Sequence, residues 1–176
     1  PTANCPSNIS QSNDPTFCSA VVNFVATATD NCPGGMVSAT PPSGSTFPVG
    51  VTTVNVLATD AAGNTDDCSF TVTVNDTEAP VAVCPADIVT NNDAGLCSAV
   101  VNFATGNSTD NCAGVTDMAT PASGSVFPVG VTVVTIVATD AVGNTHDCTF
   151  TVTVNDTEAP VAVCPANITQ GNDAGL

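Results

Sequence analysis

The sequence contains no lysine, arginine, tryptophan or tyrosine, and it has a single histidine. Its sixteen acidic residues therefore leave a formal net charge of −16 at pH 7. A surface without cations cannot neutralise phosphates, which argues against nucleic acid and against anionic lipid headgroups as partners. No apolar run is long enough to span a bilayer, so we expect no membrane insertion. The charge points instead to a divalent cation, and Ca²⁺ is the usual one outside cells.

What the sequence does have is an internal repeat with a period of about 80 residues. The stretch Asn75–Pro85 returns letter for letter as Asn155–Pro165, and the motifs between the two copies return in the same order. We predict two small domains, residues 1–79 and 80–159, followed by residues 160–176 as the truncated start of a third repeat. Domains of this size need covalent support, because their apolar cores are marginal.

Strand patterns dominate both copies. Residues 68–74 and 148–154 alternate apolar and polar side chains, which is typical of a half-buried strand. Residues 51–59 and 131–139 precede them, and the Gly-Asn pair in each connection predicts a hairpin turn. Further short strands are expected at residues 19–24 and 98–103, around Ile9 and Ile88, and at residues 37–39 and 115–119. Many short strands in each copy indicate an all-β protein made of antiparallel β-sandwiches.

The nine cysteines supply the expected covalent support. Four fall in each copy, and the ninth, Cys164, opens the third copy, so its partner is expected beyond the chain end. Four cysteines allow three pairings, and the sequence alone does not choose among them. We favour four bridges: Cys5–Cys18, Cys32–Cys68, Cys84–Cys97 and Cys112–Cys148. Zinc binding is disfavoured because the chain has no Cys-x-x-Cys motif. Disulfides imply an oxidising, extracellular compartment, so the protein is expected to be secreted or on a cell surface.

Six motifs occur in the same order in both copies: Asp-Thr-Glu-Ala-Pro, Cys-Pro-Ala, Thr-Asp-Asn-Cys, Gly-Ser-x-Phe-Pro-Val-Gly, Ala-Thr-Asp-Ala-x-Gly-Asn-Thr and Cys-x-Phe-Thr-Val-Thr-Val. Together they resemble the hyalin repeat (HYR) domain over essentially the whole chain. The resemblance implies tandem immunoglobulin-like β-sandwiches in extracellular adhesion or structural proteins, with no catalytic residues. The chain departs from ordinary members in having no lysine or arginine.

The acidic joint between the copies is a candidate Ca²⁺ site, since calcium takes six to eight oxygen ligands. The candidate ligands are Asp76 and Glu78 with Asp30 or Asp60, and in the second copy Asp156 and Glu158 with Asp110 or Asp140. A structural explanation stays open, in which Asp60 and Asp140 cap turns and Asp76 begins the linker turn. No cofactor is required on either account.

Glycans are a second candidate feature. Asn-x-Ser/Thr sequons begin at Asn8, Asn75, Asn107, Asn155 and Asn167. Threonines on the outward strand faces offer further hydroxyls, at Thr71, Thr73, Thr151 and Thr153. A glycan coat would help a surface with only 9% charged residues stay soluble. Threonine is also a good strand former, so the pattern has a purely structural explanation as well.

We predict no enzymatic activity. His146 has no counterpart in the first copy, where Asp66 stands, and no Gly-x-Ser-x-Gly elbow is present. No cationic side chain is available to stabilise an oxyanion. The first functional hypothesis is a structural protein, in which tandem repeats self-associate, or continue in the same chain, to form an extended extracellular fibre. The second is a spacer in a cell-surface adhesin whose binding domain lies elsewhere.

Overall fold

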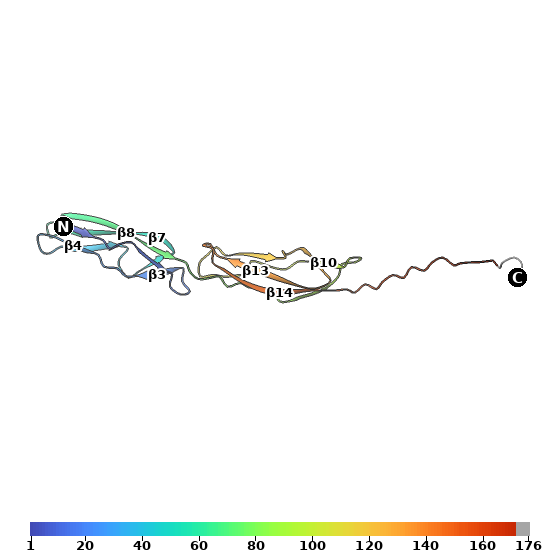
Figure 1. Ribbon diagram of the computed structural model, residues 1–176. Coiled ribbons are helices and arrows are strands. Elements are labelled where there is room, and N and C mark those ends of the chain that lie inside the picture. Colours follow the sequence, from blue (N-terminus) through green and yellow to red (C-terminus); the bar gives the residue numbers. More distant parts are fainter. Residues whose placement is uncertain (172–176) are drawn as a thin grey trace.

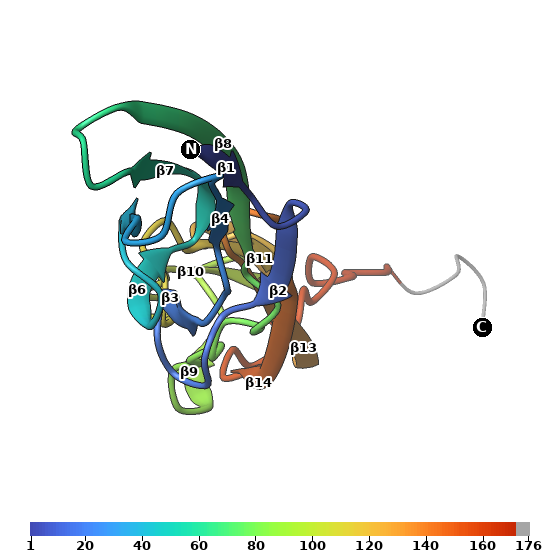
Figure 2. The ribbon, with the colours of Figure 1, turned by 90° about the vertical axis from the view of Figure 1, so that its left-hand side faces the viewer.

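A computed structural model describes residues 1–171 as two elongated β-domains placed end to end (Figure 1). All the secondary-structure elements assigned in this part of the chain are strands, and none is an α-helix. Among the same residues no helix is long and apolar enough to cross a membrane. In an end-on view (Figure 2) the equivalent strands β8 and β14 do not superpose, so the second repeat is rotated about the long axis relative to the first.

The first repeat is built around one long hairpin. Strands β7 (Gly50–Thr59) and β8 (Thr65–Asn75) pair antiparallel along their whole length, as the alternating pattern predicted. They form a four-stranded sheet in the order β2-β8-β7-β5, in which β2 runs parallel to β8. Two two-stranded sheets, β3-β6 and β1-β4, accompany it. The remaining bounds are β1 Thr2–Asn4, β2 Ile9–Ser12, β3 Ser19–Val22, β4 Thr27–Thr29, β5 Met36–Thr40 and β6 Ser45–Pro48.

The second repeat has the same arrangement. Its four-stranded sheet has the order β11-β13-β14-β9, and β10 pairs with β12. A single bridge between Val81 and Thr109 takes the place of the β1-β4 pair. The bounds are β9 Ile88–Asn91, β10 Ser98–Val101, β11 Thr116–Thr120, β12 Ser125–Pro128, β13 Gly130–Thr139 and β14 Thr145–Asn155. The sequence missed the short strands β6 and β12, because Pro48 and Pro128 made those segments read as connections.

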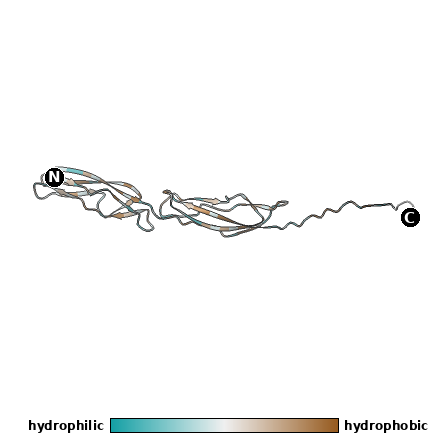
Figure 3. Ribbon diagram, viewed as in Figure 1, coloured by the Kyte–Doolittle hydropathy of each residue, from teal (hydrophilic) through white to brown (hydrophobic). Residues whose placement is uncertain are grey.

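Each repeat has its own apolar core, formed by the inward residues of the long hairpin and of the short strand pair facing it. Phe47 and Phe127 are fully buried at equivalent positions. Phe24 packs edge-to-face on Phe70 with ring centroids 4.9 Å apart, and Phe103 packs on Phe150 at 5.0 Å. Aromatic pairs of this geometry contribute beyond their buried area. Hydrophobic residues occur along the strands of both repeats (Figure 3). Some of them are exposed, including Val133 and Val137.

One disulfide closes each repeat, and it is not one of those favoured from the sequence. Cys5 bonds Cys68, and Cys84 bonds Cys148, in each case tying the segment just before β2 or β9 to the final strand of the repeat. The favoured pairings Cys5–Cys18, Cys32–Cys68, Cys84–Cys97 and Cys112–Cys148 are therefore wrong. The bridge spans 63 residues in the first repeat and 64 in the second. On the chain-entropy account, loops of this length are worth about 4 kcal/mol each.

Beyond β14 the chain leaves the second repeat as an extended segment (Figure 1). Residues 160–171 are exposed and contain no strand, and Cys164 is a free thiol. The last five residues of the predicted third copy, 172–176, lie outside the described residues. The domain boundaries proposed from the sequence stay a prediction, although the two separate cores occupy the two repeats.

Candidate functional site: the joint between the repeats

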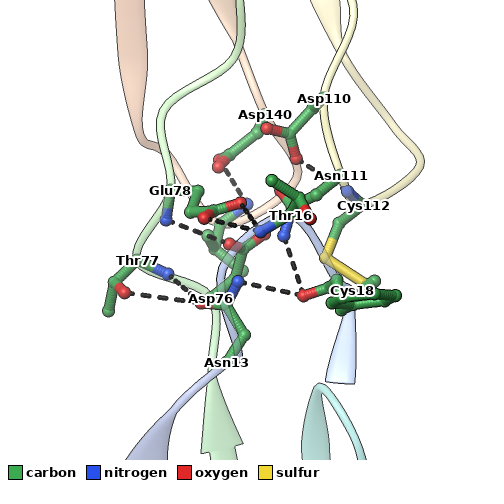
Figure 4. Close-up of a disulfide and its surroundings, with 12 residues drawn as sticks. Asn13, Thr16, Cys18, Asp76, Thr77, Glu78, Asp110, Asn111, Cys112 and Asp140 are labelled. Carbon is green, nitrogen blue, oxygen red and sulfur yellow. Dashed lines mark hydrogen bonds between the residues drawn. A yellow bond between two sulfur atoms is a disulfide. The ribbon is translucent and has the colours of Figure 1, made fainter. Parts of the chain in front are cut away.

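A disulfide joins the two repeats to each other (Figure 4). Cys18 lies in the loop between β2 and β3, and Cys112 lies in the Thr-Asp-Asn-Cys loop of the second repeat. Their Cα atoms are 4.9 Å apart although 94 residues separate them in the sequence. Cys112 is buried at this contact, with 8% of its surface exposed. The two repeats are therefore connected covalently twice, by this disulfide and by the linker segment of the chain.

Two asparagine side chains of the second repeat reinforce this connection with hydrogen bonds to backbone of the first. Asn111 donates from Nδ2 to the carbonyl oxygen of Phe17 at 3.0 Å. Asn144 donates from Nδ2 to the carbonyl oxygen of Glu78 at 2.9 Å. Inside one molecule each such bond contributes on the order of 1 kcal/mol. We call the elements that make these contacts, residues 110–112 and 140–144, the head of the second repeat; the head of the first repeat is residues 30–32 and 60–64.

The complementary elements of the first repeat are held by their own hydrogen bonds. The amide of Asn13 donates to the Phe17 carbonyl at 3.0 Å, and its oxygen accepts from the backbone N–H of Thr77 at 3.1 Å. Both carboxylate oxygens of Glu78 accept from the backbone N–H of Thr16. These bonds clamp the cysteine loop against the linker. We call residues 13–18 and 75–80 the tail of the first repeat; residues 92–97 and 155–160 form the tail of the second.

The aspartates at positions 60 and 140 are turn caps, which is the structural explanation left open by the sequence. Asp140 Oδ1 accepts from the backbone N–H groups of residues 142, 143 and 144 at 2.7–2.9 Å. Burial would raise the pKa of Asp140, but the hydrogen bonds from the Asn144 side chain and from this turn outweigh it and hold the pKa below its ordinary value. The Asn64 side chain is the main cause that lowers the pKa of Asp60. Gly63 and Gly143 adopt the positive φ that the Gly-Asn turn requires.

Asp76 and Asp110 bring two carboxylates together at the joint without any cationic side chain nearby. Carboxylate oxygens of the two residues and the sulfur of Cys112 lie within 4.8 Å of one another. That sulfur is in a disulfide, so it is not a thiolate ligand. Burial, and then repulsion from Asp110, Asp140 and Glu78, raises the pKa of Asp76 above its ordinary value. In addition, Oδ1 of Asn111 is buried with no hydrogen-bond partner. The joint thus gathers two carboxylates without a cationic partner and one amide oxygen without a hydrogen-bond donor.

The candidate calcium ligands are grouped differently from the prediction. Asp76 and Glu78 meet the head of the following repeat, with Asp110 and Asp140, and not Asp30 or Asp60 of their own repeat. Asp30 lies at the opposite end of the first repeat, 3.6 Å from the amino group of Pro1. Asp156 and Glu158 lie in the exposed tail of the second repeat. The error has a simple cause: the linker after one repeat packs against loops of the next repeat and not against the same loops of its own repeat.

The tail of the second repeat has the same internal hydrogen bonds as the first but no head against it. Asn92 donates to the Leu96 carbonyl at 2.8 Å and accepts from the N–H of Thr157 at 3.0 Å. Glu158 accepts from the N–H of Gly95 at 2.7 Å. Cys97 beside them is exposed and free, and so is Cys32 in the head of the first repeat. Both were predicted to form disulfides within a repeat, and that prediction is wrong in this structure.

Most of the remaining candidate residues lie on the two sandwiches, and Asn167 lies in the extended segment after the second repeat. The sequon residues Asn8, Asn75, Asn107, Asn155 and Asn167 are all exposed, and Thr71, Thr73, Thr151 and Thr153 are half-buried on the outward strand face. His146 accepts a hydrogen bond at Nδ1 from the N–H of Ala82, at 3.0 Å. Asp66 accepts the equivalent bond from Ala3 at 2.8 Å. His146 therefore replaces an aspartate in a structural contact that holds the first segment of each repeat.

Comparison with known proteins identifies relatives for both repeats. A family model described as "HYR domain" matches residues 1–74 and again residues 75–154. The chain is 37% identical to hyalin of Strongylocentrotus purpuratus over 99% of its own length and 15% of the hyalin. It is 38% identical to hyalin of Lytechinus variegatus over 85% of its length and 29% of that protein. It thus spans under a third of either hyalin.

A bacterial relative and a solved structure extend the comparison. The chain is 31% identical, over 69% of its length, to 10% of a "Serine-rich adhesin for platelets" of Staphylococcus aureus. Among solved structures, Drosophila N-cadherin EC1-4 aligns with 86% of the chain and 48% of its own chain, at 13% identity and a TM-score of 0.42.

Proposed function

Because the chain belongs to the HYR domain family and carries two of its repeats, we propose that it is a structural, non-enzymatic part of an extended extracellular fibre. It is an all-β, disulfide-containing repeat protein of an adhesion-related, extracellular type. The finer assignment to a fibre is supported by one observation above all, the bonded joint between the repeats. Cys18–Cys112 and the asparagine bonds hold one repeat against the next, so that successive repeats repeat one geometry.

The hydrogen bonds of the acidic residues and of the histidine support a role without catalysis. The acidic groups that sequence analysis singled out bind backbone N–H groups, as Glu78 does with Thr16 and Asp140 does with its turn. The one histidine accepts a backbone hydrogen bond through Nδ1. Their contacts are those of turn caps and strand anchors. Self-association and surface glycans are the partners that we propose for such a fibre.

Electron microscopy of the native secreted material tests this function. We expect long filaments whose axial repeat corresponds to one or two domains, with extra density around them where glycans are attached. Short flexible threads that end in a separate globular domain would contradict a fibre. They would favour the second candidate, a spacer in an adhesin, for which the similarity to the staphylococcal adhesin is the specific observation.

We also propose that the joint takes a calcium ion as part of this role. Asp76, Asp110 and the unpartnered oxygen of Asn111 supply oxygen atoms that a hard cation prefers. Calcium would then raise the melting temperature of the chain by a few degrees, while magnesium would do less. The variant Asp76→Asn should abolish this effect of calcium on the melting temperature. The matched control is Asp156→Asn, which should leave it unchanged. An identical melting curve in calcium and in a chelator would disprove the proposal.

A further inference from the structure

Each repeat carries a head at one end and a tail at the other, and only one head–tail pair is joined among residues 1–171. In that pair Cys18 of the tail bonds Cys112 of the head. The tail of the second repeat and the head of the first have no partner among residues 1–171. Each of these two open ends carries a free, exposed cysteine at the position that forms the bridge in the joint: Cys97 in the tail and Cys32 in the head.

The open tail is preformed for the contact that the closed tail makes. Three of its internal hydrogen bonds correspond one by one to bonds of the closed tail, as Asn92, Gly95 and Glu158 show. The Leu96 carbonyl accepts the Asn92 amide at 2.8 Å, just as the Phe17 carbonyl accepts the Asn13 amide at 3.0 Å. In the closed joint the Phe17 carbonyl also accepts Asn111 of the head. The equivalent oxygen of Leu96 has room for one further donor.

Both open ends are also hollowed beside their cysteine. Cys97 lines a surface depression with Asn92, Leu96 and Glu158. Cys32 lines another with Asp30, Gly35 and Met36, at the far end of the molecule. In the open head, Asn31 and Asn64 stand where Asn111 and Asn144 stand in the joined head. Asn64 donates to its own Asp60 at 2.7 Å, the bond that Asn144 also makes to Asp140. The head therefore has its donors in place.

We propose that the open tail binds the open head of a second copy of this chain, and that Cys97 of one copy forms a disulfide with Cys32 of the next. Two thiols lose two protons and two electrons, and a small-molecule disulfide such as oxidised glutathione accepts them. One thiolate attacks glutathione disulfide and releases one glutathione thiol. The second protein thiolate then attacks the mixed disulfide and releases the other.

The contact is heterologous, because a tail meets a head and not another tail. Such contacts propagate, and they give open filaments when the rotation between units does not close a ring. The joint inside the chain is the template for this step, since the same residue types would meet in the same order. This inference deepens the proposed fibre and rests on it only for its biological setting; the bond itself is a property of the two open ends.

Two complementary variants test the bond directly. Both carry Cys164→Ser, because the segment after residue 159 repeats the joint sequence and its thiol would compete. One also carries Cys32→Ser and keeps an intact tail; the other carries Cys97→Ser and keeps an intact head. Mixed in a glutathione redox buffer, they should give a heterodimer as the main oxidised product. Each variant alone should stay monomeric, and the chain with only Cys164→Ser should give a ladder of higher oligomers on non-reducing gels.

Peptide mapping of the heterodimer, with one partner ¹⁵N-labelled, identifies the bridge. A Cys32–Cys97 peptide between labelled and unlabelled chains, with Cys18–Cys112 and Cys5–Cys68 retained, is the expected result. Equal dimerisation of each variant alone would show random thiol pairing and overturn the proposal, as would a mixture that stays monomeric. If native filaments lack this cross-linked peptide, the inference is wrong and the proposed fibre stands. If native material contains the cross-linked peptide but forms no filaments, the inference stands and the proposed fibre is wrong.

Discussion

The closed joint and the two open ends are made of nearly the same residues, yet their surroundings differ. At the joint, Asn13, Cys112 and Asp140 are 8%, 8% and 7% exposed. Their equivalents at the open ends are more accessible: Asn92 and Asp60 are half-buried, and Cys32 is exposed. The difference comes from the neighbouring repeat alone. A repeat of this type therefore forms the internal hydrogen bonds of its head and tail by itself. These groups become buried only when another repeat packs against them.

The largest effect should follow from removing the joint disulfide. The double variant Cys18→Ala, Cys112→Ala is expected to lower the free energy of unfolding by about 4–5 kcal/mol, because a loop of 94 residues loses its cross-link. It should also loosen the angle between the repeats, seen as a broader distance distribution in small-angle X-ray scattering. The matched control is Cys32→Ala, Cys97→Ala, which removes only free thiols. Equal losses in both variants would mean that the joint disulfide adds nothing.

A smaller difference should separate Asn144→Ala from Asn64→Ala. Both remove the bond to the aspartate of their own turn, but Asn144 also bonds the Glu78 carbonyl across the joint. We expect Asn144→Ala to cost about 1 kcal/mol more, since a carbonyl at the joint loses its donor. Calorimetric unfolding measures the difference. If the two variants lose equal stability, the bond across the joint is not contributing.

The sequence was sufficient to predict the local features of each repeat, which are its long hairpin and its turns. The long hairpins follow from the alternation in residues 68–74 and 148–154, and the Gly-Asn turns lie where they were expected. These features are local, so periodicity and turn chemistry suffice. The turn-capping role of Asp60 and Asp140 was open from the sequence for the same reason, because an aspartate can bond the backbone of its own turn.

The disulfide between the repeats and the acidic joint could not be predicted, because they depend on which repeats touch. Four cysteines per repeat suggested two bridges inside each repeat. The structure uses two for one internal bridge, and one further cysteine of each repeat, Cys18 or Cys112, bonds the neighbouring repeat. The grouping of Asp76 with Asp110 depends on the same contact. The period of the cysteines does contain a usable signal: in an array, the second cysteine of one repeat and the third cysteine of the next are also candidates for pairing.

The acidic joint should respond to pH in a way that the open tail does not. The pKa of Asp76 is raised in the folded chain, so its ionised form destabilises the joint above its ordinary pKa, and protonation relieves this as pH falls through the raised folded value. In a chelator, Asp76→Asn should therefore stabilise the chain at pH 7 by about 0.5–1 kcal/mol, and the gain should shrink as pH falls through the raised pKa of Asp76. The oxygen of the asparagine still accepts the Glu78 N–H that Asp76 accepts. Asp156→Asn in the open tail is the control and should change little; a gain of equal size there would show that net charge, and not the joint, is responsible.

The smallest expected effect concerns the asparagines that begin the two tails. Asn75 donates from Nδ2 to the Ser10 hydroxyl at 3.0 Å, whereas Val89 stands at the equivalent position beside Asn155. Asn75→Ala should therefore cost about 0.5 kcal/mol in an unglycosylated chain, and Asn155→Ala should cost less. The same bond bears on glycosylation, because a glycan is attached to Nδ2, where it leaves a single N–H and competes for space with the Ser10 hydroxyl. In material from a glycosylating host, mass spectrometry should find higher glycan occupancy at Asn155 than at Asn75. Equal occupancy would mean that the sugar is added before β2 and β8 pair, since only the folded repeat distinguishes the two sequons.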